Sequence, residues 1–180
     1  MSNNSFLKAN LNILCCPVCS SGLQPYEDNN ALICSNNTCG TEFPIYNDIP
    51  CILNEQNSVF SNQDFANQDE TFFRERKNKF RNIVKKDIPD INVNVSAKAN
   101  YRGFAEGLDN ITGAYTKKKV LVLGGSIAGE GMMELLNNYP LIEFVETDVS
   151  FGPRAMLLCD AHNLPFINDS FDGVIAQAVL

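Results

Sequence analysis

The hydrophobic pattern is clearest in the last third of the chain. The segment KVLVLGGSIAGEGMMELL has a continuous apolar run at Val120–Leu123, two glycines, and helical spacing from Gly129 to Leu136. This order predicts a buried strand, a tight turn and a helix. Further strands are predicted at Leu141–Glu146, AMLLC (155–159) and FDGVIAQAVL (171–180). Because such strands alternate with helical or longer connections, residues 119–180 are expected to form an open, doubly wound α/β sheet.

Residues 56–118 have the spacing of two amphipathic helices. In the first, Phe73, Phe80 and Val84 share one stripe, with Asp69 as N-cap and Pro89 ending the helix. The second begins after the cap Ser96. Its apolar face consists of Ala97, Tyr101, Phe104, Ala105 and Leu108. The aromatic residues are expected to be core residues, with Tyr101 and Phe104 as the alternative choice for lining a site.

The first 55 residues follow neither periodicity, but six of the seven cysteines lie in the first 51 residues. The pairs Cys16/Cys19 and Cys34/Cys39 can close a tetrahedral thiolate site, so these four residues are predicted to bind zinc. A module of about 50 residues rarely folds without such a metal. The alternative is a set of reduced, buried thiols. Beside the four predicted zinc ligands, Cys15 is a spare thiol and Cys51 a small core residue.

Charge divides the chain at the same places. Residues 1–55 carry a net charge of −4, residues 56–119 of +4 and residues 120–180 of −7. Overall acidity argues against general nucleic-acid binding, although the basic middle remains a possible local footprint for an anion. Since the chain has no run of roughly 18 apolar residues and no secretory signal pattern, the cytoplasm is the expected location.

The cysteine region resembles a known family. CPVC, a short hairpin, LICSNNTC and then FPIYNDIPCIL are similar, over about residues 7–54, to zinc ribbons of the transfer-RNA methyltransferase activator type. The resemblance implies a ribbon that is either a free-standing partner of methyltransferases or fused in front of one. The gap between Cys34 and Cys39 is wider than the two-residue spacing of the common knuckle.

The glycine turn has two interpretations. Gly124 and Gly125 allow a ligand to approach the backbone, and Asp148 at the end of the second strand can accept hydrogen bonds from ribose hydroxyls. As a dinucleotide motif the turn matches at Gly124 and Gly129 but has Ser126 in place of the second glycine. The turn alone therefore favours a nicotinamide cofactor and an oxidoreductase.

The sequence after the turn favours a different cofactor. LLCDAHNLPFINDSFDGVIAQAVL is similar to a segment of class I S-adenosylmethionine-dependent methyltransferases. This resemblance implies an incomplete Rossmann-like sheet, preceded by two helices and a small N-terminal zinc ribbon, with boundaries at 1–55, 56–118 and 119–180. It implies that the cofactor S-adenosylmethionine has its ribose on Asp148, its adenine at Asp160, and its methionine end near the turn. The cofactor-binding residues expected are Gly124, Gly125, Ser126, Asp148, Asp160 and Ala161.

Several positions depart from that family. Val122 stands where an acid is common in the first strand, and Ser126 and Ala128 replace glycines. The connection after Asp148 is also too short for the usual helix.

Two functional hypotheses follow. In the first, the chain is a methyltransferase or the cofactor-binding portion of one, with an unknown acceptor and no assignable catalytic residue. In the second, it is a non-catalytic zinc-binding interaction module. His162 is a general base or, more simply, a capping or packing residue. The apolar strand ending at Leu180 is expected to pair with a partner chain or a second copy, unless the sequence is a fragment.

Overall fold

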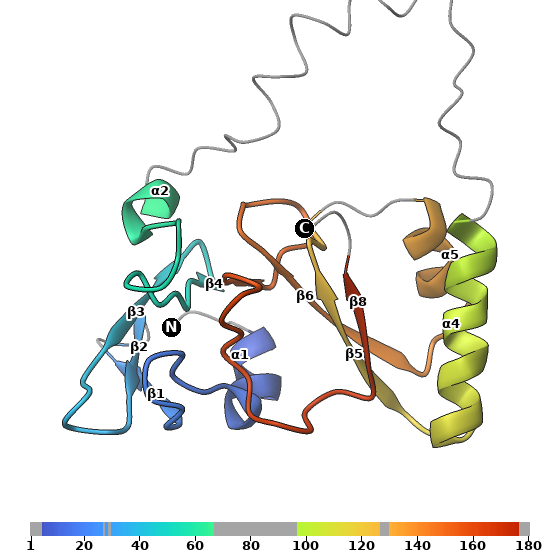
Figure 1. Cartoon of the computed structure of the whole chain (residues 1–180), viewed down its shortest axis with the longest axis horizontal. Helices are drawn as coiled ribbons and strands as arrows, with labels where there is room; N and C mark the ends of the chain where they lie inside the picture. Colours follow the sequence, from blue (N-terminus) through green and yellow to red (C-terminus); the bar gives the residue numbers. More distant parts are fainter. Residues whose placement is uncertain (1–4, 27, 29, 67–96, 127–129, 177–180) are drawn as a thin grey trace, which may run out of the picture.

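The computed structural model describes residues 5–26, 28, 30–66, 97–126 and 130–176. Two four-stranded sheets organise these residues (Figure 1). The N-terminal sheet is antiparallel, in the order β1-β2-β3-β4, and the C-terminal sheet is parallel, in the order β7-β6-β5-β8. The predicted helix with Phe73, Phe80 and Val84 lies outside the described residues.

The N-terminal part contains short elements only. They are α1 (Ser5–Asn10), the 3-10 helix η1 (Leu11–Ile13), β1 (Leu23–Tyr26), β2 (Ala31–Cys34), β3 (Glu42–Tyr46), β4 (Ile49–Pro50) and α2 (Asn62–Ala66). A two-residue turn at Asn47 and Asp48 joins β3 to β4, and both residues have positive φ, at 49° and 65°. Asn and Asp tolerate this conformation best among residues with a side chain, so the turn closes tightly without glycine.

The C-terminal part contains two longer helices and the parallel strands. They are α4 (Ala97–Thr112), β5 (Lys118–Leu123), α5 (Glu130–Asn138), β6 (Ile142–Asp148), β7 (Leu157–Leu158) and β8 (Gly173–Ala176). The predicted third strand at 155–159 is shortened to two residues, because the connection from β6 reaches β7 without a helix. The last four residues of the predicted fourth strand lie outside the described part.

One face of the parallel sheet is covered by α4 and α5 (Figure 1). The predicted apolar face of the second helix is confirmed, since Ala105 and Leu108 are buried there. Phe104 and Tyr101 approach two glycines: Cβ atoms added at Gly173 and Gly131 would lie 2.8 and 2.2 Å from these rings. Both aromatic residues are therefore core contacts between elements, as the sequence pattern indicated.

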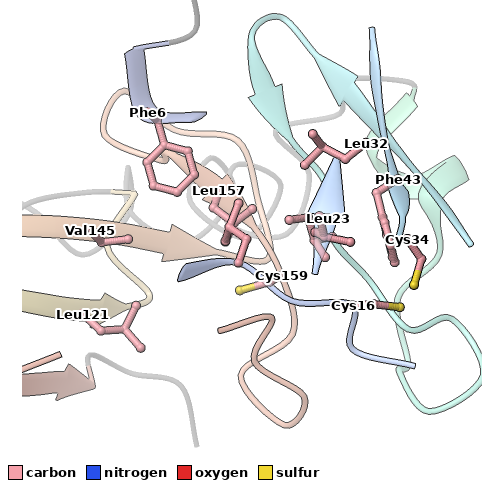
Figure 2. Close-up of a cluster of buried hydrophobic side chains, with 12 residues drawn as sticks. Phe6, Cys16, Leu23, Leu32, Cys34, Phe43, Leu121, Val145, Leu157 and Cys159 are labelled. Atoms are coloured by element: carbon pink, nitrogen blue, oxygen red, sulfur yellow. The ribbon is translucent and has the colours of Figure 1, made fainter. Parts of the chain in front are cut away.

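The opposite face shares a core with the zinc-ribbon region (Figure 2). Leu32, Phe43 and Ile52 of the N-terminal part cluster with side chains from the parallel strands. Those side chains are Leu121, Val145 and Leu157 of the strands, together with Cys159, which follows β7. The two sheets thus contribute to one continuous hydrophobic cluster, and this adds buried apolar surface that a four-stranded sheet of this size does not have by itself.

Backbone pairing also joins the two sheets. Cys51, directly after β4, forms a parallel bridge with Leu158 of β7, and the N–H of Ile52 donates to the Leu158 carbonyl at 2.9 Å. The N–H of Cys15 donates to the Pro165 carbonyl at 3.0 Å. The ribbon therefore pairs with the β7 edge of the parallel sheet.

At the other edge, β8 pairs only with β5 among the described residues. Association through the strand that ends at Leu180 stays a prediction. No helix in the described ranges is long and apolar enough to cross a lipid bilayer.

The shared core predicts that both parts unfold together. We expect Leu157→Ala to lower the free energy of unfolding by about 2–5 kcal/mol, because the side chain is fully buried between the sheets. Circular dichroism and release of zinc to a chelating dye should report one shifted transition. Ile111→Ala, at a position 84% exposed, is the control and should change little. Separate transitions, with only one shifted, would contradict a common core.

Candidate zinc centre and carboxyl-end site

The four predicted ligands come together. The Sγ atoms of Cys16, Cys19, Cys34 and Cys39 all lie within 4.8 Å of one another. Cys16 Sγ is 3.8 Å from Cys39 Sγ, and Cys19 Sγ is 3.4 Å from Cys34 Sγ. Tetrahedral zinc with bonds of about 2.3 Å requires sulfur–sulfur separations of about 3.8 Å. The donor set and its spacing therefore fit Zn²⁺.

The wide spacing of the second cysteine pair has a local explanation. In the first knuckle the N–H of Ser20 donates to the Cys16 carbonyl, and in the second the N–H of Gly40 donates to the Asn36 carbonyl. Asn36 thus starts the second turn where Cys16 starts the first. Cys34 lies two residues earlier, as the last residue of β2. The strand end supplies the ligand, so the turn itself keeps its ordinary length.

Hydrogen bonds around the cluster favour the thiolate form of Cys19 and Cys39, its two half-buried members. The side chain and backbone of Ser21 lower the pKa of Cys19 to about 6, and those of Thr41 lower the pKa of Cys39. Burial raises the pKa of Cys16 to about 12. A metal ion supplies the positive charge that deprotonates such a buried thiol. This arrangement suits a closed, structural site with four protein ligands.

The remaining cysteines lie outside the cluster. Cys15, Cys51 and Cys159 are free and buried, and Cys51 is fully buried as the sequence predicted. Burial raises the pKa values of Cys51 and Cys159 to about 12, which keeps both as inert thiols.

The glycine turn connects β5 to the region before α5. Gly124 has φ +70°, a conformation that favours glycine. A Cβ atom at Gly125 would lie 3.1 Å from Val122 Cγ1 and 3.2 Å from Glu146 Cβ, so the turn packs tightly on the strands below it. Ser126 is buried and lies at the end of this turn.

Asp148 is the last residue of β6 and contacts Ser126 at the end of the glycine turn, so its carboxylate is already hydrogen-bonded. Oδ2 accepts from the N–H and hydroxyl of Ser126, at 3.1 and 2.5 Å. Oδ1 accepts from the N–H groups of Val149 and Ser150, at 2.7 and 3.1 Å, and from the Ser150 hydroxyl. These contacts compete with any ribose hydroxyl, because a carboxylate offers about four acceptor positions.

Asp160, the residue expected at adenine, is also held by protein groups. Its Oδ2 accepts from the Ser58 hydroxyl at 2.5 Å, and its Oδ1 lies 2.9 Å from the N–H and 2.8 Å from Nδ1 of His162. Burial acts to raise the Asp160 pKa, but the hydrogen bonds from Ser58 and His162 outweigh it, so the pKa lies below its usual value. The neighbouring Ala161 is half-buried.

No motif or spacing in the sequence points to Ser58, Glu146 or Arg154. Glu146 lies in β6 and is 1% exposed. Arg154 donates from Nε, at 3.0 Å, and from Nη2 to Glu146 Oε1. Oε2 is buried with no hydrogen-bond partner among the described residues, an arrangement that costs about 1–3 kcal/mol. The signal available in the sequence was an acid that follows the apolar run Phe144–Val145 inside a predicted strand.

Burial raises the pKa of Glu146, against the opposing effect of Arg154. Val122 on β5, the position where the methyltransferase resemblance leads to the expectation of an acid, is the register partner of Glu146. A carboxyl group is thus present at this level of the sheet, but on the neighbouring strand.

The Ser58 contact generates a pH-dependent prediction. Ser58→Ala should raise the Asp160 pKa toward its usual value and lower the free energy of unfolding at pH 7 by about 1.5–3 kcal/mol, since a bond to a charged acceptor is lost. A carboxyl group whose pKa is lowered in the folded state stabilises the fold at pH values above the ordinary aspartate pKa. This stabilisation is lost as the pH falls through the pKa of the folded state. The difference in free energy of unfolding between Ser58→Ala and the unsubstituted chain should therefore vanish in that acidic pH range.

Carbon-detected NMR titration of Asp160 and denaturant unfolding measure these effects. Val59→Ala, next to Ser58 and 91% exposed, is the matched control. An unchanged Asp160 pKa in Ser58→Ala would show that this hydrogen bond does not stabilise the carboxylate.

Comparison with known proteins identifies the ribbon. Residues 8–48 match a family model described as Trm112p-like protein, a range that includes all four clustered cysteines. No curated protein matches the chain. The family match agrees with the predicted resemblance at residues 7–54 and does not extend to the parallel sheet. Residues 8–48 of this chain are a Trm112p-like zinc ribbon.

Proposed function

We propose that the chain is a non-catalytic zinc-binding interaction module, in which the ribbon supports the edge of an α/β sheet. The observation that carries the proposal is the junction at β7: Cys51 and Ile52 of the ribbon pair with Leu158, and both parts share one core. Ribbons of the activator type are partners of methyltransferases. In this chain the ribbon's partner is its own parallel sheet.

The interaction has a physical basis in unpaired edges and apolar faces. An exposed edge strand pairs with other chains, and covering it protects the sheet. Leu158 and Ala155 pack beneath Cys51, Leu53 and Phe65, which places the segment after the ribbon over the same edge. Zinc binding, which provides folding free energy to the ribbon, is thereby coupled to the stability of the parallel sheet.

Zinc removal tests this role. The folded chain should contain one zinc ion held by four thiolates. Removing the ion with a chelator, or replacing one ligand in Cys16→Ser, should unfold the ribbon and destabilise the parallel sheet with it. Metal analysis, hydrogen exchange of the β5 and β6 amides, and circular dichroism measure the effect. Cys15→Ser is the matched control, because Cys15 is adjacent but outside the cluster, and it should keep one zinc. Undiminished protection of β5 and β6 without zinc would contradict the proposal.

A second proposed function is binding of S-adenosylmethionine, as the cofactor-binding portion of a methyltransferase. It is favoured by position: the glycine turn, Asp148 and Asp160 follow the carboxyl ends of β5, β6 and β7. In open parallel sheets ligands bind outside these ends, where the strand order reverses, here between β5 and β8. The residues that would hold the cofactor are Gly124, Gly125, Ser126, Asp148, Asp160 and Ala161.

When bound, S-adenosylmethionine supplies a methyl group carried on a sulfonium sulfur. The acceptor takes the methyl group directly and displaces the sulfur. The protein's part is alignment and exclusion of water. Ser126 and Ser58 must release acceptor positions on Asp148 and Asp160 for ribose and adenine to bind there. No catalytic residue is assigned, and His162 has its Nδ1 on Asp160.

Calorimetric titration of the zinc-loaded chain distinguishes the two functions. S-adenosylmethionine should bind, NAD should not, and Asp148→Ala should abolish binding, because the ribose would lose its acceptor. Asp172→Asn is a suitable control, since Asp172 lies at the opposite end of β5, bonded to the N–H of Lys119. A folded, zinc-loaded chain that binds neither ligand would exclude the cofactor function and leave the interaction module as the remaining proposed function. Selective NAD binding would restore the oxidoreductase hypothesis.

A further inference from the structure

The connection from β6 to β7, which we call the 149–155 loop, lies between the ribbon and the glycine turn. The ring of its Phe151 packs edge-on against the Tyr46 ring of β3, with centroids 6.5 Å apart and planes at 74°. Tyr46 is itself fixed, because its hydroxyl donates to the Asn62 carbonyl of α2 at 3.3 Å. Ala155, at the end of the loop, is buried in the hydrophobic cluster against which both rings pack. The loop is therefore attached to the ribbon side at two positions.

The residue after Phe151 faces the opposite neighbour. A Cβ atom at Gly152 would lie 2.4 Å from Ser126 Cβ and 2.8 Å from the Ser126 carbonyl oxygen, so only glycine allows the loop backbone to come this close. Ser126 donates from its N–H and its hydroxyl to Asp148 Oδ2, at 3.1 and 2.5 Å. One series of contacts thus leads from the ribbon to this carboxylate: Tyr46, Phe151, Gly152, Ser126 and Asp148.

This series is separate from the junction at β7. The junction pairs the ribbon backbone with Leu158, whereas the series ends on a polar pair at the carboxyl end of β6. The loop also bonds to Asp148 directly, since the N–H groups of Val149 and Ser150 donate to Oδ1. Oδ1 is therefore held by the backbone of the loop, and Oδ2 by Ser126, against which the loop packs.

A second attachment of the loop defines the alternative explanation. Arg154 donates from Nε to Glu146 Oε1 at 3.0 Å, which ties the loop to β6 and not to the ribbon. If this tie alone held the loop, the ribbon would have no influence on Asp148. Close-packed groups transmit a displacement, because protein interiors have low compressibility. The unbroken packing from Tyr46 to Ser126 therefore favours an influence of the ribbon.

We propose that the 149–155 loop is the link through which the zinc ribbon sets the hydrogen bonding of Asp148. Phe151 and Gly152 are its positioning residues: Phe151 keeps the loop on the ribbon, and Gly152 keeps Ser126 on Oδ2. The inference rests on the first proposed function, since it requires a ribbon that zinc orders. Under the second proposed function Asp148 is the ribose acceptor, so zinc would regulate whether that position is self-bonded or open.

Hydrogen exchange of two neighbouring amides tests the link on the full, zinc-loaded chain. The Ser126 N–H is bonded to Asp148, whereas the Gly125 N–H is bonded to the Thr147 carbonyl of β6 at 3.0 Å. We expect Phe151→Leu to lower the protection of the Ser126 amide about tenfold, the equivalent of one hydrogen bond, and to leave that of Gly125 unchanged within about twofold. General destabilisation lowers the protection of both amides equally, so a difference between them reports positioning.

Two further variants keep the ribbon side of the test independent of one substitution. Tyr46→Leu should act as Phe151→Leu does, and the double variant should lose no more protection, because both changes remove the same contact. Phe60→Leu is the matched control. Phe60 packs against the same cluster, with its ring 6.5 Å from that of Phe65, and its replacement should leave the protection of both amides unchanged.

Gly152→Ala tests the other half of the link. The added Cβ atom should displace Ser126 and lower the protection of its amide, while the zinc content stays at one ion because the ribbon is untouched. Equal protection of Ser126 in this variant and in the unsubstituted chain would overturn the assignment of Gly152.

Zinc removal separates the inference from the first proposed function. Chelation should lower the protection of the Ser126 amide together with that of the β5 and β6 amides. Loss at Ser126 alone would support the link and contradict the coupling of zinc to sheet stability. Loss in β5 and β6, with Ser126 unchanged or lowered equally with Gly125 in both Phe151→Leu and Tyr46→Leu, would overturn the link alone. Full protection of Ser126, β5 and β6 without zinc would overturn both.

Discussion

The junction between the ribbon and β7 is the interaction on which the rest of the structure depends. Each sheet has four short strands and an apolar face that it cannot cover by itself. The N–H of Ile52 donates to the Leu158 carbonyl, and Leu32 and Phe43 of the ribbon belong to the same hydrophobic cluster as Leu157 of β7. Covering β7 therefore orders the ribbon and the parallel sheet at once. In the proposed function, zinc acts through this junction, because the cysteine turns flank the strands of the ribbon.

The same junction controls the carboxyl end of the parallel sheet. Asp160 lies two residues after the end of β7, and its carboxylate accepts a hydrogen bond from Ser58 in the segment after the ribbon. A carboxylate expected from sequence to serve a ligand is thus bonded to the part of the chain that zinc organises. This contact gives the ribbon a physical connection to the site without any catalytic group of its own.

The three acids at this end of the sheet have different environments, and the differences decide their possible roles. Asp148 and Asp160 are saturated by Ser126, Ser58 and His162, so a ligand must replace existing hydrogen bonds. Glu146 is deeper and keeps one oxygen unpaired beside the glycine turn. Spacing in the sequence makes Asp148 and Asp160 the obvious choices. The hydrogen bonds in the structure instead leave Glu146 as the acid with an unpaired oxygen.

The sequence by itself determined the elements whose cause is local. Thiol chemistry and turn residues predicted the four-cysteine cluster, and apolar periodicity predicted α4, α5 and the strands β5, β6 and β8 in their chain order. Only the tertiary structure decided what these elements contact. That Ser58 reaches Asp160 across 102 positions, that β7 shrinks to two residues beside the ribbon, and that Glu146 keeps a free oxygen are results of packing between distant segments. Such contacts depend on three-dimensional register, which residue spacing within one element does not encode.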